Sequence, residues 1–202
     1  VPIMAQFYYN QVDSGFIGSG LVSIIFGVLF FLSNLDYEKK LTLPQAFLLT
    51  ALSWLSIAIF GSLPFVFSDL SLSFTNAFFE SMSGITTTGS TILTNLNETP
   101  RAILLWRAML QWLGGIGIIV MAITLMPIMN IGGMQLFVIS NTHTPEKILP
   151  KSKEISIRLI VIYSSLTLVC AFFYKIFGMS FFDSIVHSMT TIATGGFSNY
   201  NE

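Results

Sequence analysis

Four long stretches of the chain carry no charged residue, and they set its architecture. A membrane helix needs about 20 consecutive apolar residues. The uncharged windows predict membrane helices near residues 15–33, 45–67, 102–126 and 155–177. The last window, 159–174, is short, and it spans a membrane if Arg158 and Lys175 extend to opposite interfaces. Pro127 is expected to end the third helix.

The two ends of the sequence interrupt this pattern. Val1–Tyr9 are interpreted as the end of an earlier helix, and Glu202 comes directly after a Thr/Gly-rich turn. We therefore expect the chain to be a fragment of a longer polytopic protein. No segment has the features of a cleaved signal peptide.

One segment occurs twice between the predicted helices. Residues 73–91 and 180–198 align at a constant offset of 107, and seven of the nineteen pairs are identical. Each copy is a short amphipathic stretch that ends in a Thr/Gly-rich turn. In a membrane protein this pattern predicts a half-helix that enters the bilayer, turns and leaves on the same side.

The basic residues support this interpretation independently. Six of the nine lie in or beside two loops, residues 34–44 and 140–154, which the positive-inside rule places in the cytoplasm. Both loops share a side only if the chain crosses the membrane an even number of times between them. The helices near 45–67 and 102–126 make two crossings, so residues 73–91 must return to the outer side, and residues 92–100 must face outward.

The composition fits a membrane protein and excludes other classes. Hydrophobic residues make up 53% of the chain and charged residues 9%, whereas soluble proteins carry about 25% charge. The net charge of −1 gives no basic face for nucleic acid. The single cysteine, Cys170, allows no disulfide framework, and no constellation of enzyme residues is present. Residues 114–117 are glycine-rich but lie within a predicted membrane helix, where close packing explains them better than nucleotide binding.

The two turns offer the chemistry of a cation filter. Consecutive backbone carbonyls can replace the water shell of K⁺ or Na⁺, and glycine permits the backbone angles that align them. The half-helix before each turn directs its negative end toward the ion. The candidate filter residues are Thr86, Thr87, Thr88 and Gly89 in the first copy and Ala193, Thr194, Gly195 and Gly196 in the second. The proposed K⁺ ligands are Thr87, Thr88, Ala193 and Thr194.

Three charged or titratable residues lie near these turns. Glu80 and His187 occupy equivalent positions, one turn before each filter. Each either supports the filter or forms a polar face toward outer water, and for His187 the second interpretation is favoured. Arg107 either pairs with a pore-helix carboxylate, with Glu80 as the candidate, or extends to the outer interface.

Four segments resemble a known family. Residues 78–89 and 191–198 resemble the first and second pore loops of Trk-type potassium uptake proteins, the TrkH/TrkG group of the Trk/Ktr/HKT superfamily. Residues 110–120 and 131–136 resemble the intervening helix and its cytoplasmic exit. The resemblance implies an all-α polytopic membrane protein of four helix–pore-loop–helix repeats, with two extra helices before them. It also implies a homodimer and a cytosolic nucleotide-binding regulatory subunit.

On this resemblance residues 1–44 hold an extra membrane helix and a cytoplasmic loop, residues 45–139 the first repeat, and residues 140–202 a further cytoplasmic loop and a second repeat as far as its pore loop. The expected function is potassium uptake across the bacterial inner membrane, with K⁺ as transported ion and no organic cofactor. The alternatives are a sodium-permeable member of the superfamily and a non-conducting membrane subunit. Glycines at positions 89 and 196 favour K⁺ over Na⁺ within the family. The basic loop 143–154 is a candidate docking surface for the regulator.

Overall fold

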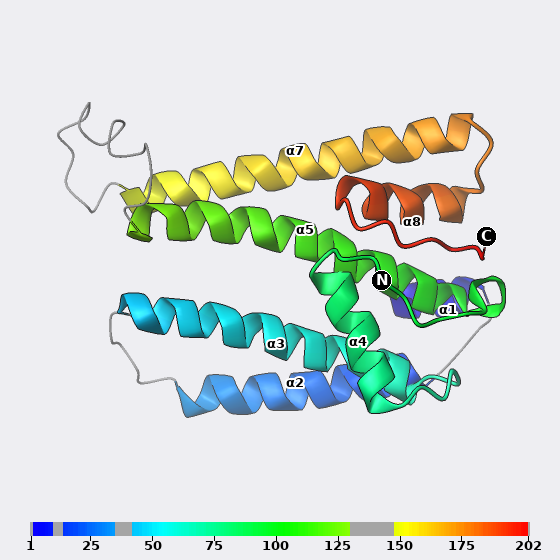
Figure 1. The fold of residues 1–202 in the computed structure, drawn as a ribbon, viewed down its shortest axis with the longest axis horizontal. Helices are drawn as coiled ribbons and strands as arrows, with labels where there is room; N and C mark the ends of the chain where they lie inside the picture. Colours follow the sequence, from blue (N-terminus) through cyan, green and yellow to red (C-terminus); the bar gives the residue numbers. More distant parts are fainter. Residues whose placement is uncertain (1, 10–13, 35–41, 130–147, 202) are drawn as a thin grey trace.

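The protein is a bundle of helices (Figure 1). The computed structural model describes residues 2–9, 14–34, 42–129 and 148–201, and no strand occurs among them. The elements are α1 (Pro2–Tyr8), α2 (Gly15–Ser33), α3 (Leu43–Phe67), α4 (Phe74–Ile85), the short 3₁₀ helix η1 (Leu96–Glu98), α5 (Arg101–Met129), α7 (Ile148–Ile176) and α8 (Phe181–Ile192).

Four of these helices are long and apolar enough to cross a membrane, as predicted. The candidate spans are Gly15–Ser33, Pro44–Phe67, Arg101–Ala122 and Glu154–Ile176. The expected stop at Pro127 is wrong, because α5 continues to Met129. Proline removes one backbone donor, and so close to the end of a helix this sacrifices few hydrogen bonds. The helix therefore ends just after the proline rather than at it.

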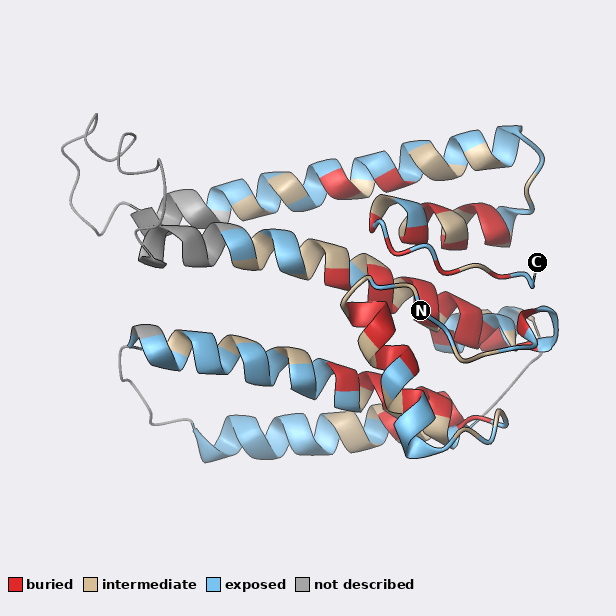
Figure 2. Cartoon of the chain, viewed as in Figure 1, coloured by how far each residue is buried: buried red, intermediate tan, exposed pale blue. Residues whose placement is uncertain are grey.

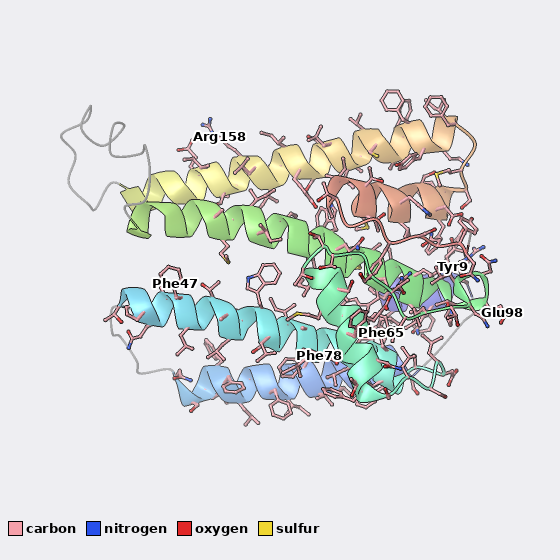
Figure 3. All side chains as sticks on the ribbon, in the orientation of Figure 1. Tyr9, Phe47, Phe65, Phe78, Glu98 and Arg158 are labelled. Carbon is pink, nitrogen blue, oxygen red and sulfur yellow. The ribbon has the colours of Figure 1, made fainter. Side chains whose placement is uncertain are left out.

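The burial pattern separates one central helix from three peripheral ones. In the most apolar window of α5, 44% of the residues are buried, against 17% in α2, 17% in α3 and 11% in α7. The peripheral helices leave many large apolar side chains exposed, among them Phe47 on α3 (Figures 2 and 3). An apolar surface of this extent is suited to lipid contact rather than to water. The chain is therefore a multi-pass membrane protein in contact with the bilayer.

The two repeated segments fold as short helices beside α5. Helix α4 packs against α3 and α5, and α8 packs against α7 and α5. Each has 12 residues, or about 18 Å of helix, which is too short for a hydrocarbon core of about 30 Å. After each helix the chain returns to the end of the bundle from which that helix started (Figure 1).

The helix ends agree with the predicted topology. The ends that flank residues 35–41 and 130–147 lie at one end of the bundle, and the α3–α4 and α7–α8 connections lie at the other (Figure 1). The chain thus crosses twice between the two basic loops, as the argument from charge requires. The loop residues 35–41 and 130–147 themselves lie outside the described residues, and the assignment of their side to the cytoplasm stays a prediction.

Candidate ion filter

The two short helices begin in the same way. Ser73 precedes α4 and Ser180 precedes α8, and each side chain accepts a hydrogen bond from a backbone N–H three residues later. These bonds satisfy one of the donors that a helix N-terminus leaves free. The start of the repeat is therefore conserved between the copies in structure as well as in sequence.

The two helices also end in the same turn. Thr87 (φ 55°) and Thr194 (φ 56°), the second residue after the end of each helix, have φ angles of the left-handed region, as do Gly89 (φ 81°) and Gly196 (φ 75°) two residues later. Negative and positive φ angles therefore alternate over residues 86–89 and 193–196. Threonine is β-branched and is rarely found in this region, where a side chain costs about 1–2 kcal/mol. Strain of this kind at equivalent positions of two copies points to function.

Helix-capping hydrogen bonds hold each turn in place. In the first copy the N–H of Thr88 donates to the carbonyl of Ser83 at 3.0 Å, and in the second the N–H of Gly195 donates to that of Thr190 at 2.9 Å. The N–H of the preceding residue, Thr87 or Thr194, donates to the carbonyl three residues before it at 2.9 Å. This pairing is a Schellman motif, in which glycine normally occupies the left-handed position. It fixes the direction in which the chain leaves each short helix.

The two turns lie against each other. A Cβ on Gly89 would overlap the carbonyl oxygen of Gly195. A Cβ on Gly195 would in turn lie 2.5 Å from the side-chain oxygen and nitrogen of Gln111 on α5. Gly89 therefore allows the two backbones to approach closely, and a side chain at Gly195 would have to displace the Gln111 amide. The structure brings the predicted residues 86–89 and 193–196 together as neighbouring parts of one site.

Two adjacent glycines of α5 seat the ends of the short helices. A Cβ on Gly114 would overlap the carbonyl of Ile85, the last residue of α4. A Cβ on Gly115 would lie 3.3 Å from the Cα of Ala193, which follows α8, and 2.5 Å from the Tyr163 hydroxyl. The predicted packing role of these glycines is thereby confirmed, with the short helices as partners.

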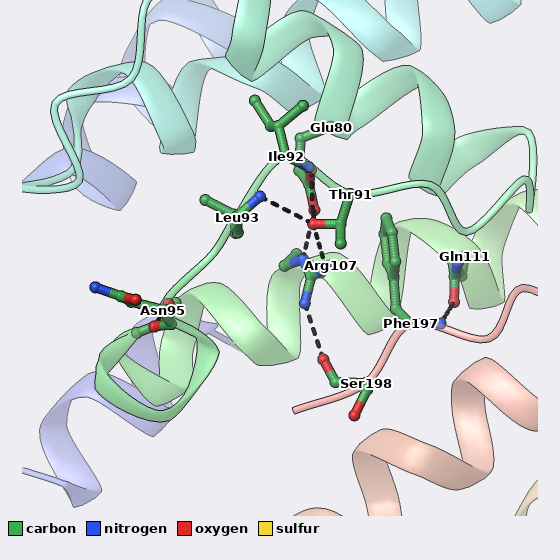
Figure 4. A network of polar contacts seen from close by, with 10 residues as sticks. Glu80, Thr91, Ile92, Leu93, Asn95, Arg107, Gln111, Phe197 and Ser198 are labelled. Atoms are coloured by element: carbon green, nitrogen blue, oxygen red, sulfur yellow. Dashed lines mark hydrogen bonds and ion pairs between the residues drawn. The ribbon is translucent and has the colours of Figure 1, made fainter. Parts of the chain in front are cut away.

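A buried ion pair lies behind the first turn (Figure 4). The Nε of Arg107 donates to Glu80 at 2.7 Å, and the two side chains are 2% and 0% exposed. Glu80 also accepts from the Thr91 hydroxyl at 2.8 Å and from the backbone N–H of Ile92 at 3.1 Å. Of the two interpretations of Arg107, the pairing with Glu80 is therefore correct. The pair ties α4 and α5 to the segment that leaves the first turn.

Arg107 reaches the second turn as well. One terminal nitrogen donates to the Ser198 carbonyl at 3.1 Å, and the other donates to the Thr91 hydroxyl at 2.9 Å. Its guanidinium lies 4.1 Å from the centre of the Phe197 ring, a cation–π contact. A single side chain of α5 thus holds the outgoing segments of both turns.

The second copy has a carboxylate of its own, one helical turn earlier than the first. Asp183 accepts from Asn199 at 2.7 Å and from the Tyr200 hydroxyl at 2.6 Å, and both donors follow the second turn. The bond to Asp183 and partial burial raise the pKa of the Tyr200 phenol, so this donor keeps its proton. His187, at the position equivalent to Glu80, contacts the Asp183 carbonyl and stacks on Tyr200.

Several residues that hold these turns in place were not predicted from the sequence. Thr91, Gln111, Asp183 and Asn199 act through polar side chains, and Ser198 acts through its backbone carbonyl; most of their partners are distant in sequence. The alignment carried one usable signal, since Asp183 matches Asn76 in the first copy. No signal in the sequence indicated the role of Gln111, because a single glutamine in an apolar helix does not show which residue it will contact.

Comparison with known proteins identifies the family. A family model described as "Cation transport protein", TrkH, matches residues 14–202. The chain belongs to the TrkH family. It is 40% identical to the Trk system potassium uptake protein TrkH of Vibrio parahaemolyticus over 98% of this chain and 42% of that protein. It is 48% identical to TrkI of Halomonas elongata over 77% of this chain and 32% of the relative.

The fold agrees with a solved member of the TrkH family. The crystal structure of the potassium transporter TrkH from Vibrio parahaemolyticus matches with a TM-score of 0.85 at 38% identity, over 98% of this chain and 40% of that one. The chain thus spans about two fifths of the length of these relatives. The resemblance inferred from the pore-loop residues is confirmed.

Proposed function

We propose that this chain supplies two walls of a K⁺-selective filter in a potassium uptake protein. The observation that carries the proposal is the recurrence of one strained turn, left-handed at Thr87 and Gly89 and again at Thr194 and Gly196, in two segments that touch. The names of the relatives, Trk system potassium uptake proteins, support the choice of ion.

The turns suit a dehydrated cation. Alternation of positive and negative φ angles lets successive carbonyls point toward one side, where they can replace the hydration shell of K⁺. The ligands on this proposal are the carbonyls of residues 86–89 and 193–196, with K⁺ at Thr87, Thr88, Ala193 and Thr194. Helices α4 and α8 enter the bilayer from the outer side and return, and they direct their negative ends at the ion. Glu80 and Arg107 support the filter from behind.

Membership of the TrkH family supports a proposal for the cellular setting. The whole transporter lies in the bacterial inner membrane, forms a homodimer and binds a cytosolic nucleotide-binding regulator. The basic loop 143–154 contributes to that docking surface. Residues 143–147 lie outside the described part of the chain, and residues 148–154 form the start of α7.

Substitution of the two filter glycines tests the proposal. Gly89→Ser and Gly196→Ser, made separately in the full-length protein, should each lower the K⁺ over Na⁺ uptake ratio. A Cβ in the left-handed region costs about 1–2 kcal/mol, and each 1.4 kcal/mol of lost differential binding is about a tenfold loss of preference. At Gly196 no atom of the described residues contacts the added Cβ within 4 Å, so the substitution acts through strain, whereas Gly89→Ser also collides with Gly195. Gly89→Ser should therefore lose more total uptake.

The controls are the equivalent serines of the two short helices. Within the described part of the chain, the buried Ser81 hydroxyl has no hydrogen-bond partner, and the Ser188 hydroxyl donates to the Ile185 carbonyl of its own helix. Ser81→Ala and Ser188→Ala should leave the uptake ratio unchanged. Uptake is measured in cells that lack other K⁺ uptake systems, with membrane expression measured in parallel. If both glycine variants keep the wild-type ratio and rate, these turns are not the filter. Equal uptake of Na⁺ and K⁺ by the unmodified protein would instead indicate a sodium-permeable member.

A further inference from the structure

Gln111 touches the backbone of the second turn from behind and also lies close to the first. It comes from the middle of α5, one helical turn after Arg107 and one before the glycine pair that seats the short helices. It is 0% exposed. A polar side chain buried this deeply in an apolar helix is expensive unless its hydrogen bonds are made.

One end of the Gln111 amide is fixed by the second turn. Its Oε1 accepts a hydrogen bond from the backbone N–H of Phe197 at 3.2 Å (Figure 4). Since only the oxygen can accept from an N–H, this contact also sets which way the amide faces. The plane of the amide packs directly on Gly195, where a Cβ would lie 2.5 Å from both its oxygen and its nitrogen.

The other end of the amide faces the first turn. Nε2 lies 3.8 Å from the position that a Cβ on Gly89 would occupy. This nitrogen is buried and has no hydrogen-bond partner among the residues that the structure describes. An unmade buried hydrogen bond is unfavourable. The amide is therefore held at this position by its packing against the two turns and by its bond to Phe197, although its Nε2 makes no hydrogen bond within the described part of the chain.

Gly89, Gly195 and the Gln111 amide thus form three successive layers in contact. We propose that Gln111 is a specificity-determining positioning residue, which sets the distance between two filter walls by its length and by its bond to Phe197. This inference rests on the proposed function, because it acts on the same filter. It concerns selectivity rather than transport as such. A shorter or apolar side chain lets the second wall relax toward α5, and the carbonyl spacing that distinguishes K⁺ from the smaller Na⁺ changes.

Two substitutions separate the length of the side chain from its hydrogen bond. Gln111→Asn keeps an amide but withdraws it by one methylene group, and Gln111→Met keeps the length but removes the acceptor for Phe197. In the full-length protein, both should lower the K⁺ over Na⁺ uptake ratio, by about threefold to tenfold. Ile119→Met, on an outward-facing part of the same helix, is the matched control and should leave the ratio unchanged.

The readouts are K⁺ and Na⁺ uptake in cells without other K⁺ uptake systems, the membrane expression, and the elution of the solubilised protein as a single folded species. A lowered ratio in either variant, in protein that is expressed and folded like the wild type, supports the inference. An unchanged ratio in both folded variants overturns it. If both variants fail to fold while Ile119→Met folds, Gln111 is needed for structure alone and the inference is also overturned. The glycine variants distinguish the two failures, because they leave the ratio unchanged only if the proposed filter itself is wrong.

Discussion

Substitution of Arg107 should lower the stability of the protein far more than substitution of an exposed arginine with equally close contacts. The Glu80 and Arg107 side chains are 0% and 2% exposed, and their atoms approach to 2.7 Å. Loss of one partner of a buried pair leaves the other charge uncompensated and destabilises a protein by about 3–5 kcal/mol. Arg107→Gln also removes the donors to Ser198 and to Thr91.

The chain contains a matched control for this comparison. Arg158 and Glu154 approach to 2.6 Å, but their side chains are 73% and 63% exposed. Exposed pairs of this kind contribute about 0.2–1 kcal/mol. Arg158→Gln should therefore lower the melting temperature only slightly, although the contact is as short as that of the buried pair.

A double-mutant cycle tests the coupling directly. Arg107→Gln, Glu80→Gln and the double variant are purified in detergent, and their melting temperatures and K⁺ uptake are compared. Each single variant should lower the melting temperature strongly. The double variant should be more stable than the sum of the two effects implies, because no buried charge remains unpaired. If Arg107→Gln is as mild as Arg158→Gln, or if the two effects simply add, the pair does not hold the filter segments together.

Two further predictions concern packing and topology. Gly114→Ala should prevent accumulation of folded transporter, because the added Cβ overlaps the Ile85 carbonyl. Gly117→Ala should be tolerated, because its Cβ lies at an ordinary contact distance of 3.6 Å from the Trp54 ring. The expression and the elution of the solubilised protein are measured for both variants. Single cysteines at positions 38, 97 and 147 should report the orientation in intact cells, with an impermeant reagent labelling 97 alone; labelling of 38 or 147, or protection of 97, would reverse it.

The fold was predictable because its signals are local. Charge-free windows located the four spans, and the helix start at Ser73 and the turn at Thr87–Gly89 recur at Ser180 and Thr194–Gly196. Capping serines and turn glycines act within a few residues, so their effect can be read directly from the chain. The predicted helix end at Pro127 was wrong, because a proline close to the end of a helix removes few hydrogen bonds and the helix can continue past it.

The side chains that support the two turns were less predictable, because their partners are distant in sequence. Glu80 is 27 residues from Arg107, and Phe197 is 86 residues from Gln111. The sequence alone does not show whether Glu80 and Arg107 form a buried pair or two separate exposed charges. The packing of α4 against α5 decides this. Asp183 was missed for a related reason, since its donors come from the segment that leaves the turn rather than from the turn itself.

The displaced carboxylate limits what an alignment of the two copies can reveal. The first copy is braced by Glu80 and the second by Asp183, whose counterparts are His187 and Asn76. The two copies share the course of the main chain, while the side chains that brace it lie one helical turn apart. Residues at aligned positions of the two copies therefore need not have the same role. A search for the braces of other copies should look for any carboxylate in the first two turns of the short helix, paired with a donor beyond the turn.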